Sequence, residues 1–213
     1  MYKKGSAVFL VFTDGESNSS EVDADQAWNK EFVEAVLSVP GVSDYGRYIA
    51  IKGGPKHLFF FELENADVVN DLAARKLIPG RDAATGATLF NEAIIAGDQI
   101  LPRKAEPAVR GMAPYLQIGR MSVPADIESA WNHWYDNEYV AGFLSVPGLI
   151  YARRFRVVAG DVRYMTVYEF ENGEVSVSPE WVRQRHSSSA DSPRMRAANQ
   201  MAAGSPGIYR RVI

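Results

Sequence analysis

Residues suited to proton transfer are concentrated in one short segment of the second half of the chain. His133, Tyr135, Glu138 and Tyr139 fall within seven consecutive positions. Carboxylates and imidazoles act as general acids or bases, and packing of Glu138 among aromatic rings would raise its pKa towards a useful range. The hydroxyls of Tyr135 and Tyr139 could donate hydrogen bonds to a carbonyl or enolate oxygen, although both side chains could equally be core residues with a polar tip. The segment therefore predicts proton-transfer chemistry.

Each of these residues also has a structural interpretation, and the sequence leaves the choice open. Glu138 recurs as Glu31 in the first half, and a residue kept in both halves is as easily structural as catalytic. His133 precedes Asp136 by three positions, so a carboxylate could orient its imidazole for acid or base catalysis. The same spacing is typical of an exposed polar helix face. We expect Glu138 or His133 to be the proton-transfer group of a site in this half.

A second set of residues is suited to binding a ligand. Arg154 could bind a carboxylate or phenolate, or could form an ion pair with Glu138 or Glu169. The second half contains 12 arginines, no lysine and 10 acidic residues, whereas the first half contains 11 basic and 16 acidic residues. This asymmetry favours a small anionic ligand near the second half. The predicted ligand-binding residues are Arg154, Trp134, Tyr164, Tyr168 and His186, the last of which could otherwise be the solvated end of a helix.

The composition excludes several kinds of partner. Three scattered histidines and the absence of cysteine predict that there is no dedicated metal site. The sequence also lacks a glycine-rich phosphate loop, the motif that would indicate a nucleotide cofactor. The net charge of −3 argues against a nucleic acid partner. No segment approaches the ~18 apolar residues that cross a bilayer. The short apolar run 7–12 is better explained as a β-strand than as a signal peptide, so we expect a cytoplasmic protein without a membrane partner.

A repeated pentapeptide organises the chain. Leu-Ser-Val-Pro-Gly occurs at 37–41 and again at 144–148, an offset of 107 residues, and the same offset aligns Glu62-Leu63-Glu64-Asn65 with Glu169-Phe170-Glu171-Asn172. Proline cannot continue a helix and the glycine tolerates positive φ, so this motif ends a helix and reverses the chain. We predict a duplicated unit that covers residues 1–106 and 107–213, each a ferredoxin-like barrel unit.

Hydrophobic periodicity predicts the same order of elements in both units. The expected strands are 7–12, 45–52, 57–64 and 100–104 in the first unit and 115–121, 150–159, 162–171 and 208–213 in the second. The expected helical regions are 23–37 and 68–96, then 124–144 and 179–203 with a break around 187–193. This order is β-α-β-β-α-β, the ferredoxin-like motif.

Neither face of the predicted sheets is simply polar. In strand 164–170, one side carries Tyr164, Thr166, Tyr168 and Phe170, and the other carries Met165, Val167 and Glu169. Helices cover one face of such a sheet, so the other face needs a second cover. We expect an α+β protein in which the two units pack sheet to sheet within one chain.

The motifs of the second unit resemble those of a known superfamily. Trp134-Tyr135-Asp136-Asn137-Glu138-Tyr139, the Val146-Pro147-Gly148 turn, Arg153-Arg154-Phe155 and the strand 164–170 are similar to the dimeric α+β barrel superfamily, closest to its EthD-like and stress-responsive types. The histidine of the family's helix motif is Tyr139 here and Phe32 in the first copy. Some members bind haem, so the resemblance makes a haem protein a third and less favoured hypothesis.

Two hypotheses, which belong to different functional classes, are favoured over the haem protein. The first is a cofactor-independent small-molecule enzyme, an isomerase, cyclase, lyase or oxygenase-like protein, acting on an aromatic or polyketide-like compound in an apolar Tyr- and Trp-lined pocket of the second unit. The second is a non-catalytic or stress-associated barrel protein that binds a small ligand. Convergence of acid or base side chains on one cavity would favour the enzyme. Duplication makes a two-chain barrel unnecessary, while exposed edges leave room for a homodimer.

Overall fold

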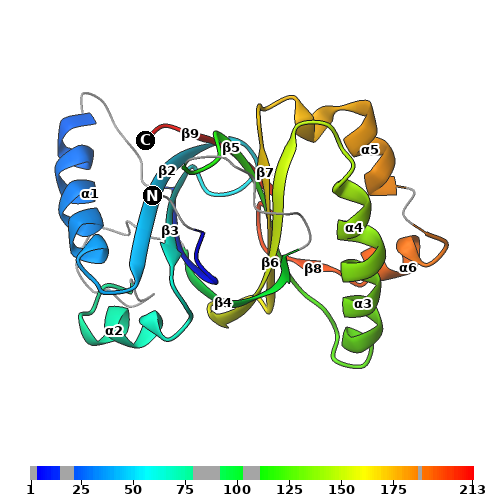
Figure 1. Ribbon diagram of the computed structural model, residues 1–213, viewed down its shortest axis with the longest axis horizontal. Coiled ribbons are helices and arrows are strands. Elements are labelled where there is room, and N and C mark those ends of the chain that lie inside the picture. The colour runs from blue at the N-terminus through cyan, green and yellow to red at the C-terminus, as the bar shows by residue number, and fades with distance from the viewer. Residues whose placement is uncertain (1–3, 15–21, 79–91, 103–110, 187–188) are drawn as a thin grey trace.

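The computed structural model describes residues 4–14, 22–78, 92–102, 111–186 and 189–213 (Figure 1). Within these ranges, no helix is both long and apolar enough to cross a lipid bilayer. The predicted boundary between residues 106 and 107 lies outside the described residues.

The two halves contain the same order of principal elements. The first half contains β1 (Ala7–Thr13), α1 (Val22–Leu37), β2 (Val42–Lys52), β3 (His57–Leu63), α2 (Val68–Ala74) and β4 (Glu92–Pro102). The second half contains β5 (Tyr115–Ser122), α3 (Glu128–Trp134), a π-helical turn (Tyr135–Tyr139), α4 (Val140–Phe143), β6 (Leu149–Ala159), β7 (Tyr164–Phe170), a 3₁₀ turn (Val175–Val177), α5 (Pro179–His186), α6 (Ser192–Ala197), β8 (Gln200–Met201) and β9 (Gly207–Arg211). The predicted β-α-β-β-α-β order is therefore confirmed in both halves.

The end of the first unit differs from the prediction. The helical region expected over 68–96 ends at Ala74 among the described residues, and the last strand begins at Glu92 instead of residue 100. Backbone pairing explains the early start, because Ala93, Ile94 and Ile95 pair with the central strand β1. Residues 79–91 of the expected helix lie outside the described residues.

The repeated pentapeptide forms the same turn twice. Gly41 and Gly148 have φ values of 88° and 80°, the left-handed region that favours glycine. In each copy the glycine carbonyl accepts a backbone hydrogen bond, from Glu64 at 2.7 Å and from Glu171 at 3.0 Å. A Cβ atom at Gly148 would lie 2.5 Å from Cγ2 of Val175, so a larger residue would strain this turn. The turn ends the helix and reverses the chain as predicted, and β2 begins at Val42, earlier than the expected residue 45, while β6 begins at Leu149.

The strands close into a barrel within one chain. The order is β4-β1-β3-β2 in the first half and β9-β5-β7-β6 in the second, which is the same arrangement. Antiparallel pairing of β4 with β6 and of β2 with β9 joins the two sheets edge to edge. Helices α1 and α2 lie outside on one side, and α3 to α6 lie outside on the other (Figure 1). Equal topology in the halves is what a duplication predicts.

The alternation of side chains along the strands assigns them to two environments. Met165 and Val167 point into the barrel, whereas Tyr164, Tyr168 and Phe170 face the helices, so both sheet faces are buried as expected. The barrel interior is mainly apolar and includes Val8, Leu10, Phe12, Tyr48, Leu58, Phe60, Leu116, Ile118, Phe155, Met165, Val167 and Tyr209. The helix-facing side of the second half is therefore separate from the barrel interior.

Candidate functional site

Aromatic side chains fill the space between the helices and the sheet of the second half. Neighbouring rings lie close together, with centroids 4.6 Å apart for Trp131 and Tyr135 and 4.1 Å apart for Phe143 and Trp181. We call this group the aromatic layer; it consists of Trp131, Trp134, Tyr135, Tyr139, Phe143, Tyr168 and Trp181. The sequence predicts an apolar Tyr- and Trp-lined pocket here, whereas these rings pack mainly against one another among the described residues.

The π-helical turn carries three of the predicted catalytic residues, Tyr135, Glu138 and Tyr139. Such turns are rare and occur frequently at functional sites. The hydroxyl of Tyr135 is buried and hydrogen-bonded to Oγ1 of Thr166 at 3.0 Å. Burial raises the pKa of Tyr135 and of Tyr139. Both phenols are therefore held in their neutral, hydrogen-bonding form, while Glu138 is partly exposed beside them.

His133 does not pair with Asp136 as its spacing suggested. The imidazole is exposed, and its Nδ1 lies 3.3 Å from the side-chain amide of Asn137, one helical turn further on. Asp136 is turned inward and forms an ion pair with Arg154. The π-helical turn begins at Tyr135, so the regular helical spacing used to place Asp136 does not apply there.

Arg154 lies at the centre of the layer and has no exposed surface. Its guanidinium donates to the carboxylate of Asp136 through Nη1 and to the side-chain amide oxygen Oδ1 of Asn132 through Nη2. Three rings surround the cation, with centroids at 4.9 Å for Trp131, 4.8 Å for Tyr135 and 4.5 Å for Tyr164. Arg154 therefore forms an ion pair, as expected, but its partner is Asp136 and the predicted partners Glu138 and Glu169 are wrong. Glu169 faces the barrel interior, on the other side of the sheet.

Asn132 connects the buried arginine to a cavity. Its amide nitrogen donates to the hydroxyl of Tyr164 at 3.0 Å, and that hydroxyl donates to Oε1 of Glu128 at 2.6 Å. Oε2 of Glu128 lies 3.1 Å from Nη1 of Arg163, whose side chain is 55% exposed. The hydrogen-bonded series therefore runs from Arg154 through Asn132 and Tyr164 to a carboxylate near solvent.

Glu128, Asn132 and Tyr164 line a cavity of about 730 Å³, together with Arg156 and Arg163. We call it the helix-side cavity. Its volume lies within the range of small-molecule sites. Its walls are largely polar, with a carboxylate, an amide, a phenol and two guanidinium groups. Acid, base and hydrogen-bonding groups therefore converge here, beside the aromatic layer.

The remaining predicted ligand-binding residues lie elsewhere. Trp134 donates from its indole nitrogen to Oγ of Ser192 at 3.1 Å, in the layer between α3 and α6. The ring of Tyr168 packs 5.0 Å from Trp181, and burial raises the pKa of its hydroxyl well above the ordinary value. His186 is exposed at the end of α5, with Nδ1 3.5 Å from Nη1 of Arg196. The structure brings the predicted residues Tyr135 and Tyr164 together around Arg154, and it also groups Trp134, Tyr135, Tyr139 and Tyr168 in the aromatic layer.

Sequence reasoning missed Glu128 and Asn132. A signal was present, since positions 128, 132 and 135 have the i, i+4, i+7 spacing of one helix face. The polar members of this face were overlooked because only its aromatic members resembled a motif.

The described histidines are not placed to hold a metal or haem iron in the helix-side cavity. Within them, no group of three His, Cys, Asp or Glu side chains is arranged to hold a metal ion. His133 and His186 are exposed, and His57 lies on β3 of the first half. None of the three lines the helix-side cavity. Haem iron requires an axial ligand, commonly histidine, and no described histidine is placed to provide one in this cavity.

The closed antiparallel sheet with helices outside both halves is the dimeric α+β barrel fold, here built from a single chain. The structure is similar to an anthrone oxidase-like protein, with 12% identity, a TM-score of 0.58, and 97% of this chain and 90% of that chain covered. It is also similar to chlorite dismutase from Candidatus Nitrospira defluvii in complex with imidazole, with 11% identity, a TM-score of 0.61 and coverage of 99% and 92%. A proposed monooxygenase from Fusobacterium nucleatum has 8% identity, a TM-score of 0.55 and coverage of 100% and 94%. No family model and no curated protein matches the sequence significantly. These similarities show the fold.

Proposed function

We propose that this protein is a cofactor-independent enzyme that transfers a proton to or from an aromatic small molecule in the helix-side cavity. The observation that carries the proposal is the 2.6 Å hydrogen bond between Tyr164 and Glu128 in the wall of that cavity. Proton abstraction begins isomerase, cyclase, lyase and oxygenase-like reactions alike, so the proposal concerns this shared step. Two neighbours of the same fold, an anthrone oxidase-like protein and a proposed monooxygenase, are consistent with chemistry on organic compounds.

Each polar group has a defined role in this step. The carboxylate of Glu128 accepts the proton as a substrate C–H bond breaks, and the electron pair moves onto the substrate's carbonyl oxygen to give an enolate. The second N–H of the Asn132 side-chain amide is a hydrogen-bond donor for that oxygen. Tyr164 donates its single proton to the Glu128 carboxylate before the reaction, and as Glu128 takes up the substrate proton the Tyr164 hydroxyl turns to donate to the enolate oxygen. Arg154 is a positioning residue, because it donates a hydrogen bond to the side-chain Oδ1 of Asn132 and so directs the Nδ2 of the same amide towards Tyr164.

Arg156 and Arg163 favour substrates that already carry negative charge. Both line the cavity, and both are exposed on their solvent side. A phenolate or carboxylate on the substrate would be attracted by these two guanidinium groups. This agrees with the anionic ligand that the arginine-rich second half predicts.

The proposal is tested by solvent exchange of aromatic carbon acids, with anthrone as the first probe. The protein is incubated with anthrone in D₂O without oxygen, and proton NMR measures loss of the anthrone methylene signal. This loss reports proton abstraction alone, whatever reaction the enolate would undergo afterwards. We expect the protein to accelerate exchange and Glu128→Gln to lower the enzymatic rate by about 10²–10⁴, the usual contribution of general acid–base catalysis. Glu138→Gln and His133→Gln test the sequence-based alternatives directly. Loss of exchange in Glu138→Gln with an unchanged rate in Glu128→Gln would move the base to the π-helical turn.

The non-catalytic alternative makes a different prediction for the same samples. A ligand-binding barrel protein would broaden or shift the probe's NMR signals while exchange stayed at the buffer rate across the panel. That result would reject the enzyme proposal. Unchanged binding in Arg156→Gln would in turn reject this cavity as the ligand site.

A further inference from the structure

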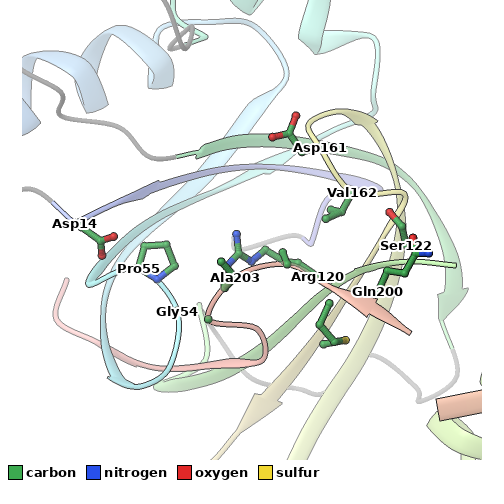
Figure 2. Close-up of a pocket in the computed structure, with 12 residues that line it drawn as sticks. Asp14, Gly54, Pro55, Arg120, Ser122, Asp161, Val162, Gln200 and Ala203 are labelled. Carbon is green, nitrogen blue, oxygen red and sulfur yellow. Dashed lines mark hydrogen bonds between the residues drawn. The ribbon is translucent and has the colours of Figure 1, made fainter. Parts of the chain in front are cut away.

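A second cavity lies at one mouth of the barrel. It has a volume of about 580 Å³, and elements from both halves form it: the end of β1, the β2–β3 turn, the end of β5, the β6–β7 turn and the segment around β8. Figure 2 shows Arg120 extending into it, with Asp14 and Asp161 on separate segments around it. We call it the barrel-mouth cavity. Barrel mouths are common sites for small ligands, and the volume is suitable for one.

Arg120 places a positive charge at the floor of this cavity. It follows the inward-facing Leu116 and Ile118 on β5 and is 2% exposed. Its guanidinium lies 4.6 Å from the ring of Phe12, and Nη2 donates to the carbonyl of Ala203 at 2.8 Å. These contacts fix the side chain at the boundary between the apolar interior and the cavity. Burial lowers the pKa of Arg120, and the nearby Tyr209 and Asp14 act in the opposite direction, so Asp14 is close enough to interact with this charge.

Two carboxylates lie at the rim of the same cavity. Asp14 follows β1 and accepts a backbone hydrogen bond from Lys56 at 2.8 Å, which holds it against the β2–β3 turn. Asp161 lies in the turn between β6 and β7. Both residues are exposed, whereas Arg120 is buried. The cavity is therefore positive at its floor and negative at its rim.

We propose that the barrel-mouth cavity binds a small zwitterion, an amine joined to a carboxylate, with the carboxylate at Arg120 and the ammonium group between Asp14 and Asp161. A simple anion would be attracted by Arg120 at the floor and repelled by the aspartates at the rim. A simple amine would be attracted by the aspartates and repelled by Arg120. Only a ligand with both charges complements both ends. Arginine suits the carboxylate because its planar guanidinium can donate two parallel hydrogen bonds.

This site is separate from the one proposed for proton transfer. The helix-side cavity is lined by α3 and the outer side of the β6–β7 hairpin, whereas the barrel-mouth cavity includes Arg120, which faces inward. Val162 lines both, so the cavities lie on either side of the β6–β7 turn. Their ligands can therefore be tested independently.

A graded series of ω-amino acids tests the proposal. Glycine, β-alanine, γ-aminobutyrate, δ-aminovalerate and ε-aminocaproate are titrated by saturation-transfer NMR against the full chain. The matched controls are the carboxylate and the amine of each length. We expect one chain length to bind at least about tenfold more tightly than either matched control, as a charge-assisted hydrogen bond and its partner ion pair allow. Equal binding of the amino acid and its carboxylate, or no saturable binding in the series, would overturn the zwitterion proposal.

Variants of the cavity residues test which residue binds the carboxylate end and which residues bind the ammonium end of the amino acid. Asp14→Asn and Asp161→Asn, both at exposed positions, should each weaken amino acid binding about two- to fivefold and leave the matched carboxylate no weaker, as for exposed ion pairs. Arg120→Met should weaken both amino acid and carboxylate by at least about tenfold. Asp67→Asn, exposed beside α2, is the control and should change nothing. If Arg120→Met fails to fold, the two aspartate variants alone decide the result, and unchanged selectivity in both would reject the site.

Discussion

Arg153 of the second half and Glu62 of the first half form a bidentate ion pair inside the barrel. Nη2 and Nη1 of the arginine lie 2.7 Å and 2.9 Å from the two carboxylate oxygens, and both side chains are almost fully buried. Lys4 and Glu169 complete the cluster, with Nζ of the lysine 2.6 Å from Oε2 of Glu169. Two cations and two anions balance there. The cluster is a direct polar link between the halves in addition to their paired strands.

Removal of one charge from this cluster should destabilise the protein strongly. Glu62→Gln leaves Arg153 and Lys4 with a single carboxylate in a buried environment, and an unbalanced buried ion costs about 3–5 kcal/mol. Urea unfolding followed by circular dichroism should show this loss. The control is Glu64→Gln, an exposed carboxylate two residues further along, which should change the free energy of unfolding by less than about 0.5 kcal/mol. Equal midpoints for both variants would contradict a structural role for the pair.

Arg154 should be intolerant of lysine even though the charge is kept. The guanidinium serves Asp136 and Asn132 at once and lies against three rings, and an ammonium group cannot reproduce this planar contact. Arg154→Lys should lower the free energy of unfolding by about 1–3 kcal/mol, because a buried polar partner loses its hydrogen bond. Arg156→Lys, exposed on the same strand, provides the matched control for stability. A drop of similar size in both variants would show that the loss is not specific to the buried site.

The sequence predicted the fold well because local signals and the repeat agree. The Val-Pro-Gly turns, the strand order and the two faces of strand 164–170 follow from residue preference and period-2 alternation. Because side chains alternate along a strand, the adjacent residues Arg153 and Arg154 must face opposite sides of the sheet. The partners of each could not be predicted, because Glu62 meets Arg153 through closure of the barrel, which joins residues 91 positions apart.

The site was predicted less completely for a local reason. The aromatic residues of helical region 124–144 were predicted to line a pocket and are instead packed in one layer, and the π-helical turn at 135–139 changes which polar residues face inward. Glu128 and Asn132, which reach Tyr164, lie in α3 before this turn and were missed because no motif contained them. The turn itself directs Asp136 to Arg154. A helix assumed to be regular throughout gives no indication of this change.

The hydroxyl of Tyr164 should matter more for activity than for stability. Tyr164→Phe keeps the ring beside Arg154 and removes the donor to Glu128, so unfolding should change by only about 0.5–1.5 kcal/mol. The enzymatic exchange rate of anthrone should fall about 10²–10³, as for loss of one oxyanion donor. Tyr45→Phe, on β2 of the first half, is the control and should keep the rate. A parallel fall in both variants, or a large loss of stability with no change in rate, would assign Tyr164 a packing role.

Alkaline pH should unfold the protein through its buried tyrosines. Burial raises the pKa of Tyr45 to about 12, and it also raises the pKa values of Tyr48, Tyr135, Tyr139, Tyr168 and Tyr209. In the unfolded chain tyrosine ionises near pH 10. Above that pH the folded state binds more protons than the unfolded state, so stability that is complete below about pH 10 falls as pH rises.

Lys4 acts in the opposite sense, and its contribution should be outweighed. Burial lowers the pKa of Lys4, so the folded state binds fewer protons than the unfolded state below the ordinary lysine pKa of 10.5, and stability rises with pH there. Six tyrosines act against this single lysine above about pH 10. Urea midpoints measured from about pH 8 to pH 11.5 should therefore fall at the alkaline end, and most tyrosinate absorbance should appear together with loss of the circular dichroism signal. Gradual ionisation of the tyrosines while the folded signal persists would show that these phenols are open to solvent.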